Sequence, residues 1–457
     1  DSGGPISPDQ SGAEFYDTIL YLATTKLDPG IIWAATDDGL VQLTRDAATN
    51  PAHVAHWKNV SPPEALVPPW GRVMGLEPGR FAAGTAFIAV ERHLLGDEHP
   101  YVLRTDDYGA TWRSISGDLP PNQFVRTIRQ DPRNGNVLYA GTNRGVWITL
   151  DGGAHWESLR LNMPATAIYD LEVQPDADDL VVASHGRGVW ILDDLSPLQN
   201  WSQTAQSQVT FFAPRPAYRM WQWSPLNTFT DPKIPPNEFV GDNPDYGALL
   251  TYDLGRDAKS ARIEIADESG RVVRTLTGDD VPAKRGVNRT SWDLNETGPV
   301  KWTGTFKENQ GPDTGAEVVP GSYIVRLTVD GVVKTQNVTV KPDPRDPDLA
   351  KARNRRDYLA ALFNDLGTID TMLNSIDARM KHATGAQASA LAAFKQRLTY
   401  GPRNIEDLSG PAQIREGVLD LISRASSSLQ APTEAQQAQA AAYKSQLGAL
   451  SATYARL

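Results

Sequence analysis

The N-terminal part of the chain repeats itself, and this repetition limits its fold more than any other feature. Three segments align: LDPGIIWAATDDGLVQLTRD (27–46), QDPRNGNVLYAGTNRGVWITLDGGAHW (130–156) and LVVASHGRGVWILDD (180–194). Each has a β-rich apolar run, a tight turn with glycine and a second apolar run, which predicts a β-hairpin. A more divergent fourth copy covers 76–93 and 101–112.

The four copies share a proline whose spacing fits one architecture. Pro29, Pro78, Pro132 and Pro175 stand 49, 54 and 43 residues apart. A four-stranded propeller blade takes about 40–50 residues. The spacing therefore predicts propeller blades over residues 1–195.

Two copies carry the pattern T-x-D-x-G-x-[TH]-W after their third expected strand. It occurs as TDDYGATW (105–112) and TLDGGAHW (149–156), and a third copy that starts at Thr44 and Asp46 is interrupted by an insertion at 47–56. The aspartate and threonine can bind turn N–H groups, glycine supplies a positive φ, and tryptophan packs into the blade. We therefore expect these residues to be structural rather than catalytic. They are Thr105, Asp107, Gly109, Trp112, Thr149, Asp151, Gly153 and Trp156.

This pattern is the Asp box (BNR repeat) of sialidases and sortilin-type receptors. Together with GGPISPDQSGAEFYDTI (3–19) and DLVVASHGRGVWILDDLSPL (179–198), it resembles the C-terminal propeller region of bacterial secreted sortilin-type proteins, often labelled glycosyl hydrolases. In that family several more blades precede this region, which implies a partial propeller here. Because an open half-propeller would expose apolar blade faces, we expect the upstream blades on a second polypeptide. A closed ring of four blades is the alternative. The resemblance also implies a secreted or periplasmic location.

The repeats stop near residue 195, and the composition then changes. Residues 196–246 are rich in proline and asparagine, which predicts a connector. Residues 247–343 contain alternating strands, and their stretch PGSYIVRLTVDG resembles the immunoglobulin-like module of flagellar hook-cap assembly proteins. We expect a β-sandwich there.

The C-terminal region 349–457 has the periodicity of helices. Seven apolar residues with alternating spacings of three and four predict one long helix, and further helices are expected at 385–399, 411–429 and 433–456. Short connections favour an antiparallel bundle. The fold class expected overall is mainly β: a partial propeller, an Ig-like sandwich and a helical bundle. The seven residues are Leu359, Leu362, Leu366, Ile369, Leu373, Ile376 and Met380.

Composition excludes several classes of function. A net charge of −11 over 457 residues disfavours nucleic acid as a partner. The absence of cysteine excludes disulfides and thiolate metal sites, and no apolar run is long enough for a membrane span. No cofactor fingerprint is present, and His53 with His56, inside the insertion, do not complete a metal site. We therefore expect no cofactor and no metal.

A ligand-binding function follows from the hairpin turns. Aligned copies place Asp38, Arg144 and Arg187 at matching positions, with His185 beside the last. Such a rim suits an anionic or polar ligand, but a hairpin turn also tolerates these residues without any binding role. We therefore expect the propeller to bind a protein, a peptide or a glycan.

A glycoside hydrolase or lyase is the alternative. Glycoside hydrolysis needs two carboxylates about 5–9.5 Å apart. The candidates are Asp37, Asp38, Glu91 and Glu172, with the site completed by upstream blades. A carboxylate pair facing one pocket would favour the enzyme, whereas arginine and aromatic side chains would favour binding.

Overall fold

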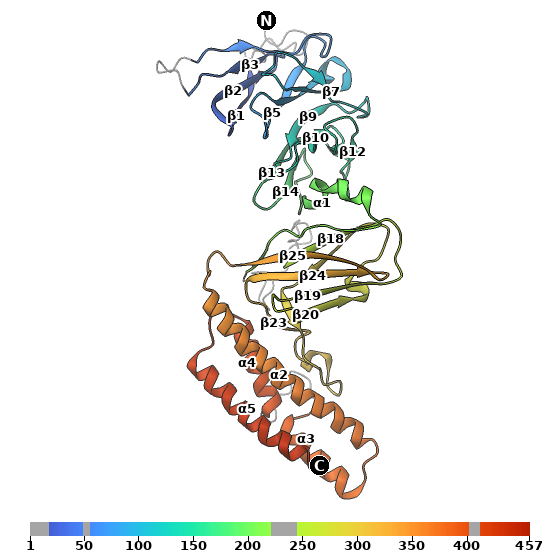
Figure 1. Cartoon of the computed structure of the whole chain (residues 1–457), viewed down its shortest axis with the longest axis vertical. Helices are drawn as coiled ribbons and strands as arrows, with labels where there is room; N and C mark the ends of the chain where they lie inside the picture. Colours follow the sequence, from blue (N-terminus) through green and yellow to red (C-terminus); the bar gives the residue numbers. More distant parts are fainter. Residues whose placement is uncertain (1–17, 49–54, 221–244, 402–411) are drawn as a thin grey trace. The chain divides into compact units, whose positions relative to one another are not determined.

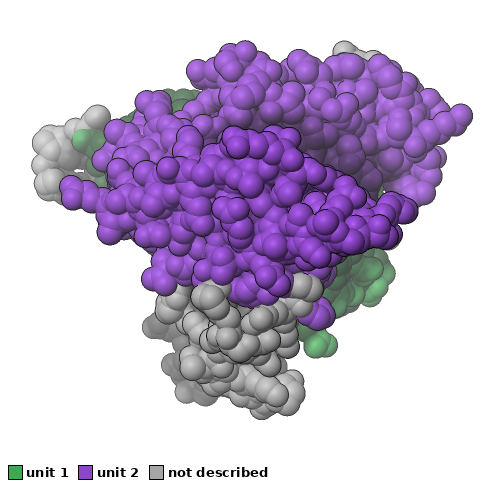
Figure 2. All heavy atoms as spheres, turned by 90° about the horizontal axis from the view of Figure 1, so that it is seen from below, with its two compact units in different colours: residues 1–205 green, residues 206–457 purple. Residues whose placement is uncertain are grey.

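The computed structural model describes residues 18–48, 55–220, 245–401 and 412–457. The chain divides into two compact units, residues 1–205 and 206–457 (Figure 2). Most of the stretch 3–19, and also His53, lie outside the described residues.

Unit 1 consists of four antiparallel meanders, in which consecutive strands pair (Figure 1). This is the strand order of propeller blades, and we call them blades 1 to 4. Blade 1 comprises β1 (Ile19–Thr25), β2 (Asp28–Thr36), β3 (Val41–Thr44) and β4 (Lys58–Asn59); blade 2 comprises β5 (Arg72–Pro78), β6 (Ala86–Arg92), β7 (Asp97–Thr105) and β8 (Arg113–Ser114). Blade 3 comprises β9 (Val125–Gln130), β10 (Leu138–Thr142), β11 (Gly145–Thr149) and β12 (Glu157–Ser158); blade 4 comprises β13 (Ile168–Gln174), β14 (Asp179–Ser184) and β15 (Val189–Leu192).

Neighbouring blades pack face to face through the apolar runs of the repeats. Trp33 and Ile88 belong to a core shared by blades 1 and 2, and Tyr139 and Val182 to one shared by blades 3 and 4. A further core joins blades 2 and 3. Their first strands also contact one another in the order β1, β5, β9, β13. The apolar side chains that predicted the strands therefore also hold the sheets together.

The last strand of blade 4 has an uncovered face. Val189 and Ile191 on β15 are 67% and 60% exposed. Both lie on the same face, because side chains alternate along a strand. A short helix, α1 (Ser196–Gln199), follows this strand.

Unit 2 begins with two sheets that share one apolar core. The first sheet has the order β16 (Val209–Phe211), β18 (Ala248–Leu254), β21 (Gly286–Trp292). The second has the order β17 (Ala217–Arg219), β25 (Val332–Pro342), β24 (Gly321–Val329), β19 (Ala261–Ala266), β20 (Val272–Thr277). A separate pair, β22 (Asn295–Thr297) and β23 (Thr314–Glu317), lies between β21 and β24 in the chain.

The expected connector 196–246 is more than a connector. Its strand β16 pairs with β18, and its strand β17 pairs in parallel with β25. Both sheets therefore recruit strands from before residue 247. The alternation of β24 behaves as its sequence predicts, since Tyr323, Val325 and Leu327 are buried in the shared core.

Four helices complete unit 2: α2 (Leu349–Met380), α3 (Gly385–Leu398), α4 (Ile414–Ser426) and α5 (Glu434–Tyr454). Of the seven periodic residues on α2, Met380 alone is exposed and the others are buried in a core shared with α3, α4 and α5. The helices do not form this core by themselves. Trp302, from the segment between β22 and β23, is completely buried among them.

Candidate functional site

One end of blades 2 to 4 carries a continuous series of charged and aromatic side chains. His93 stacks on Phe124, with ring centroids 4.4 Å apart and planes inclined by 8°. The guanidinium carbon of Arg126 lies 5.3 Å from the centre of the Phe124 ring and 4.4 Å from that of Tyr169. Tyr169 stacks on His185 at a centroid distance of 4.9 Å. We call these five residues the aromatic row.

The buried end of the aromatic row is held by Glu91. Its Oε2 lies 3.2 Å from both His93 Nδ1 and Arg126 Nε, and its Oε1 lies 3.6 Å from Arg72 Nη1. The Glu91 side chain is only 2% exposed. A buried carboxylate between two guanidinium groups joins blade 2 to blade 3. It is shielded from substrate, which argues for a structural role.

The opposite end of the aromatic row reaches solvent. Tyr169 is 46% exposed, and His185 is exposed beside it. The turns that carry Arg144 and Arg187 lie at this same end, because Thr142 pairs with Val125 and Ser184 pairs with Ile168. The predicted residues Arg144, His185 and Arg187 are thus at one end of blades 3 and 4, and both arginines are exposed.

The predicted acidic residues of blade 1, Asp37 and Asp38, accept hydrogen bonds within that blade. Asp37 is buried and accepts a hydrogen bond from the backbone N–H of Thr18 at 2.8 Å. Asp38 accepts one from the hydroxyl of Thr36. Gly39, in the same turn, lies against the carbonyl of Gly71 at the start of blade 2. Asp38 therefore shares the end of the blades with Arg144 and Arg187, but its carboxylate is engaged locally.

Glu172, the remaining catalytic candidate, lies on β13. Its side chain is 63% exposed, and its Oε2 is 3.8 Å from Arg129 Nε. The four candidate carboxylates thus come from three blades, and each has a different partner. Arginine and aromatic side chains dominate the end of blades 3 and 4.

Sequence reasoning missed most of the aromatic row, although a signal for it was present. Arg72, Arg126 and Tyr169 each stand six residues before the shared proline of their repeat. Aligning the repeats on that proline therefore places all three at one level of three adjacent strands. The ligand-binding residues predicted from the sequence lie at hairpin turns, whereas these three residues lie at the starts of β5, β9 and β13.

The T-x-D-x-G-x-[TH]-W turn of blade 2 is held by its own side chains. Thr105 Oγ1 accepts a hydrogen bond from the N–H of Gly109 at 2.9 Å and donates to Asp107 Oδ1 at 2.9 Å. Asp107 Oδ1 also accepts from the N–H of Thr111 at 2.8 Å. The indole N–H of Trp112 donates to the carbonyl of Val60 at 2.7 Å, which ties the turn to blade 1.

The turn of blade 3 repeats this arrangement. Asp151 accepts hydrogen bonds from the hydroxyl of Thr149 at 2.8 Å and from the N–H of His155 at 3.0 Å. Trp156 Nε1 donates to the carbonyl of Ile115 at 2.9 Å. Gly153 has φ of 99°, and a Cβ there would lie 2.6 Å from Ile115 Cβ, so only glycine fits.

The insertion at 47–56 leaves the blade 1 turn closed, which the sequence did not predict. Thr44 Oγ1 donates to Asp46 Oδ1 at 2.8 Å. Asp46 Oδ1 also accepts from the N–H of His56 at 3.0 Å, and its Oδ2 lies 2.6 Å from the ring Nδ1. His56 therefore takes the place that His155 has in blade 3. Trp57, however, is 45% exposed.

We expect the blade 3 turn to weaken in acid. Burial alone would raise the pKa of Asp151, but the hydrogen bonds from His155, Thr149 and Ala154 lower it to about 2, from an ordinary 3.8. Because the folded pKa is the lower one, the carboxylate stabilises the fold above about pH 4, and this contribution is lost as pH falls toward 2.

Thermal unfolding of the wild type and Asp151→Asn at pH 7, 4 and 2.5 tests this expectation. The difference in Tm should be largest at pH 7 and should narrow as pH falls. Asp176→Asn, on an exposed loop, is the control and should change Tm little at any pH. A difference for Asp151→Asn that stays constant with pH would contradict the assignment.

Two searches of the described residues gave negative results. No group of three or more His, Cys, Asp or Glu side chains among them is placed to hold a metal ion. No helix in the described part of the chain is long and apolar enough to cross a membrane.

The chain is weakly similar to two kinds of known protein. It is 27% identical over 173 residues to a xyloglucanase from Hypocrea jecorina. The aligned region covers 35% of this chain and 19% of that protein. It is 33% identical over 86 residues to vacuolar protein sorting/targeting protein 10 from Aspergillus fumigatus. This aligned region covers 18% of this chain and 6% of that protein. The chain thus spans less than a fifth of the length of either relative. No family model matches.

Among solved structures, YCF48 bound to D1 peptide aligns with a TM-score of 0.28 and 18% identity, over 58% of this chain and 69% of that chain. The two sequence relatives and the four consecutive meanders of unit 1 support a β-propeller family.

Proposed function

We propose that unit 1 binds a protein or peptide ligand at the end of blades 3 and 4, and that this ligand carries acidic side chains. The observation that supports this most directly is the aromatic row, whose solvent end places Tyr169 and His185 near the exposed arginine turns. Tyrosine and arginine are enriched among residues that dominate binding energy. A protein ligand also fits the similarity to a vacuolar protein sorting/targeting protein.

A glycoside hydrolase or lyase remains the second candidate function. The similarity to a xyloglucanase favours it. The positions of the candidate carboxylates argue against this function. Glu91 is buried in ion pairs, and Asp37 and Asp38 accept hydrogen bonds from Thr18 and Thr36 in blade 1.

Further features of the protein stay proposals. Its resemblance to secreted sortilin-type proteins supports a secreted or periplasmic location. The uncovered face formed by Val189 and Ile191 supports contact with a further propeller blade, carried by a second polypeptide. The two-sheet core and the helical core of unit 2 support an Ig-like module at 247–343 and a helical bundle at 349–457.

The binding proposal predicts a selective effect of Tyr169→Ala. Fluorescence anisotropy with a labelled peptide of alternating glutamate and leucine should show saturable binding, and the variant should weaken it about tenfold or more. Phe81→Ala is the matched control. Phe81 is 52% exposed and lies in the β5–β6 connection of blade 2, at the end opposite to the proposed binding site. It should leave the affinity unchanged.

Two further probes separate the candidate functions. The lysine counterpart of the peptide should bind much more weakly than the glutamate peptide. Equal binding of both peptides, or equal effects of the two alanine variants, would contradict the proposal. Cleavage of xyloglucan oligosaccharides, lost in Glu172→Gln or Asp38→Asn, would favour the glycoside hydrolase instead.

A further inference from the structure

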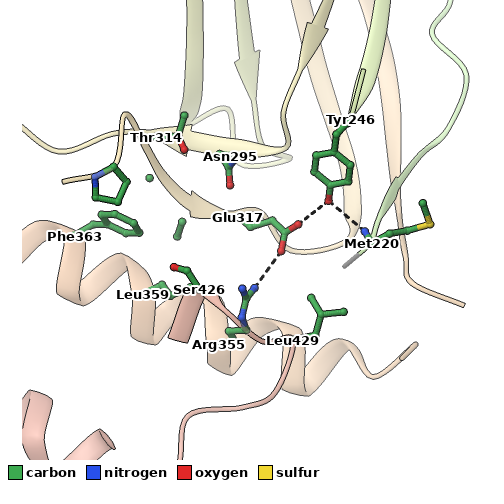
Figure 3. A pocket seen from close by; sticks show the side chains of 13 residues that line it. Met220, Tyr246, Asn295, Thr314, Glu317, Arg355, Leu359, Phe363, Ser426 and Leu429 are labelled. Atoms are coloured by element: carbon green, nitrogen blue, oxygen red, sulfur yellow. Dashed lines mark hydrogen bonds and ion pairs between the residues drawn. The ribbon is translucent and has the colours of Figure 1, made fainter. Parts of the chain in front are cut away.

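A pocket of about 340 Å³ lies within unit 2, where β22 and β23 meet the helices α2 and α4. Its apolar lining includes two groups of side chains, Leu359 with Phe363 and Met220 with Leu429. Figure 3 shows Arg355 pointing from α2 toward Glu317, with Leu359 and Phe363 on one side of this pair and Met220 and Leu429 on the other. An apolar wall with a few convergent polar groups is typical of small-ligand sites.

The polar groups of this pocket form one network around a carboxylate. Glu317 Oε2 accepts hydrogen bonds from Arg219 Nε at 2.7 Å and from Arg355 Nη1 at 3.1 Å. Glu317 Oε1 accepts from the hydroxyl of Tyr246 at 2.7 Å. That hydroxyl in turn accepts from the backbone N–H of Met220 at 3.2 Å. Both carboxylate oxygens therefore have donors.

The network contains more positive than negative charge. The side chains of Arg219 and Arg355 are 6% and 5% exposed, and both pair with the single carboxylate of Glu317. Arg355 Nε also donates to the carbonyl of Ala425 at 3.2 Å, which is neutral. Among the described residues that line the pocket, Glu317 is the only acid. Nearby Glu296 pairs with Arg356 and Arg271 instead. Among the described residues, two buried guanidinium groups thus share one carboxylate.

Two further observations agree with incomplete compensation of these guanidinium groups, of which Arg355 lines the pocket and Arg219 lies behind Glu317 in the network. Arg219 Nη2 is buried and has no hydrogen-bond partner in the described structure. Burial lowers the pKa of Arg355, although Glu317 opposes this effect. A buried cation without full compensation is costly, and an anion entering the pocket would offset the cost.

We propose that this pocket binds a small organic carboxylate with an apolar tail. The ligand carboxylate would lie against Arg355, and the tail would lie along Met220 and Leu429, on one side of that guanidinium. The neutral side chains of Asn295, Thr314 and Ser426 line the same pocket and suit the remaining polar atoms of the ligand. The carboxylate could belong to a free acid or to the C-terminus of a peptide.

Calorimetric titration of the full chain with octanoate tests the proposal. Octanol and octylammonium have the same tail without the negative charge and should bind at least about tenfold more weakly. Leu429→Trp fills the space beside Met220 while keeping every charged side chain of the network, and it should abolish octanoate binding. Equal affinity for octanol, or the absence of octanoate binding at millimolar concentrations, would overturn the proposal.

Two variants of the network should act in opposite directions. Arg355→Met removes the cation and should weaken octanoate binding about tenfold or more, whereas Glu317→Gln removes the competing carboxylate and should strengthen it. General damage to the fold would not strengthen binding. Arg356→Met, whose guanidinium pairs with Glu296 outside the pocket lining, is the control and should leave the affinity unchanged.

A peptide ending in a leucine carboxylate, compared with its C-terminal amide, distinguishes the two sources of the ligand. Tighter binding of the peptide acid than of octanoate would assign the pocket to a protein C-terminus. Tighter binding of octanoate would assign it to a free acid. The proposal concerns unit 2 alone, so its failure would not affect the function proposed for unit 1.

Discussion

Arg415→Met is expected to lower the free energy of unfolding of unit 2 by about 3–5 kcal/mol. Arg415 on α4 donates to the carboxylate of Asp370 on α2 from Nε at 2.6 Å and from Nη2 at 3.1 Å. The two side chains are 2% and 0% exposed. Without the guanidinium, the buried carboxylate keeps the backbone N–H of Trp302 as a hydrogen-bond donor, at 2.9 Å, but no positive charge in contact with it among the described residues. An uncompensated charge inside the core is the cause of the loss.

Urea unfolding followed by circular dichroism at the helical band measures this effect, because α2 to α5 all belong to unit 2. Arg424→Met is a matched control on the same helix. Arg424 pairs with Asp420 one turn away, and both side chains are more than half exposed. This control should cost less than about 0.5 kcal/mol. Equal losses in the two variants would contradict the buried-charge argument.

A double variant tests the cause of the loss separately from its size. Asp370→Asn in the Arg415→Met background removes the unpaired charge and keeps an acceptor for the Trp302 N–H. It should therefore recover part of the lost stability, since the penalty comes from the charge rather than from the missing contact. A double variant that recovers no stability relative to Arg415→Met would show that the lost packing of Arg415 against the Trp302 ring, 5.4 Å away, causes the loss rather than the unpaired charge.

The hairpins of unit 1 could be predicted because their signals are local. The turn at Arg144 and Gly145 joins two runs of β-forming residues, and β10 and β11 pair around it as expected. The periodic residues of α2 could be predicted for the same reason. One face of a helix is encoded within a single stretch of sequence.

The ion pair of Glu91 and Arg126 could not be predicted in this way. The two residues lie on different sheets, and only the packing of blade 3 against blade 2 brings them to 3.2 Å. The strands β16 and β17 could not be predicted from the sequence for a related reason. Each has three residues, too few to show an alternation, and β17 depends on pairing with β25 more than a hundred residues later.

Glu91→Gln is expected to destabilise unit 1 by about 3 kcal/mol while leaving unit 2 unchanged. The carboxylate faces Arg72 and His93 from its own blade and Arg126 from the next. Glutamine keeps the shape but removes the charge, so two guanidinium groups lose their buried counter-ion. Hydrogen exchange should therefore quicken in β6 and β9, the strands that carry Glu91 and Arg126.

Glu172→Gln is the control that separates a structural from a catalytic role. Its side chain is 63% exposed and lies 3.8 Å from Arg129, so the substitution should cost less than about 1 kcal/mol. Faster exchange in Glu91→Gln alone, with slow exchange retained in β18 and β24, would agree with a carboxylate that joins two blades. Unchanged exchange in both variants, together with loss of glycan cleavage in Glu91→Gln, would instead make Glu91 part of an active site. The decisive quantity is therefore local stability. A buried acid that pairs with cations on two sheets is expected to destabilise the packing of those sheets when its charge is removed.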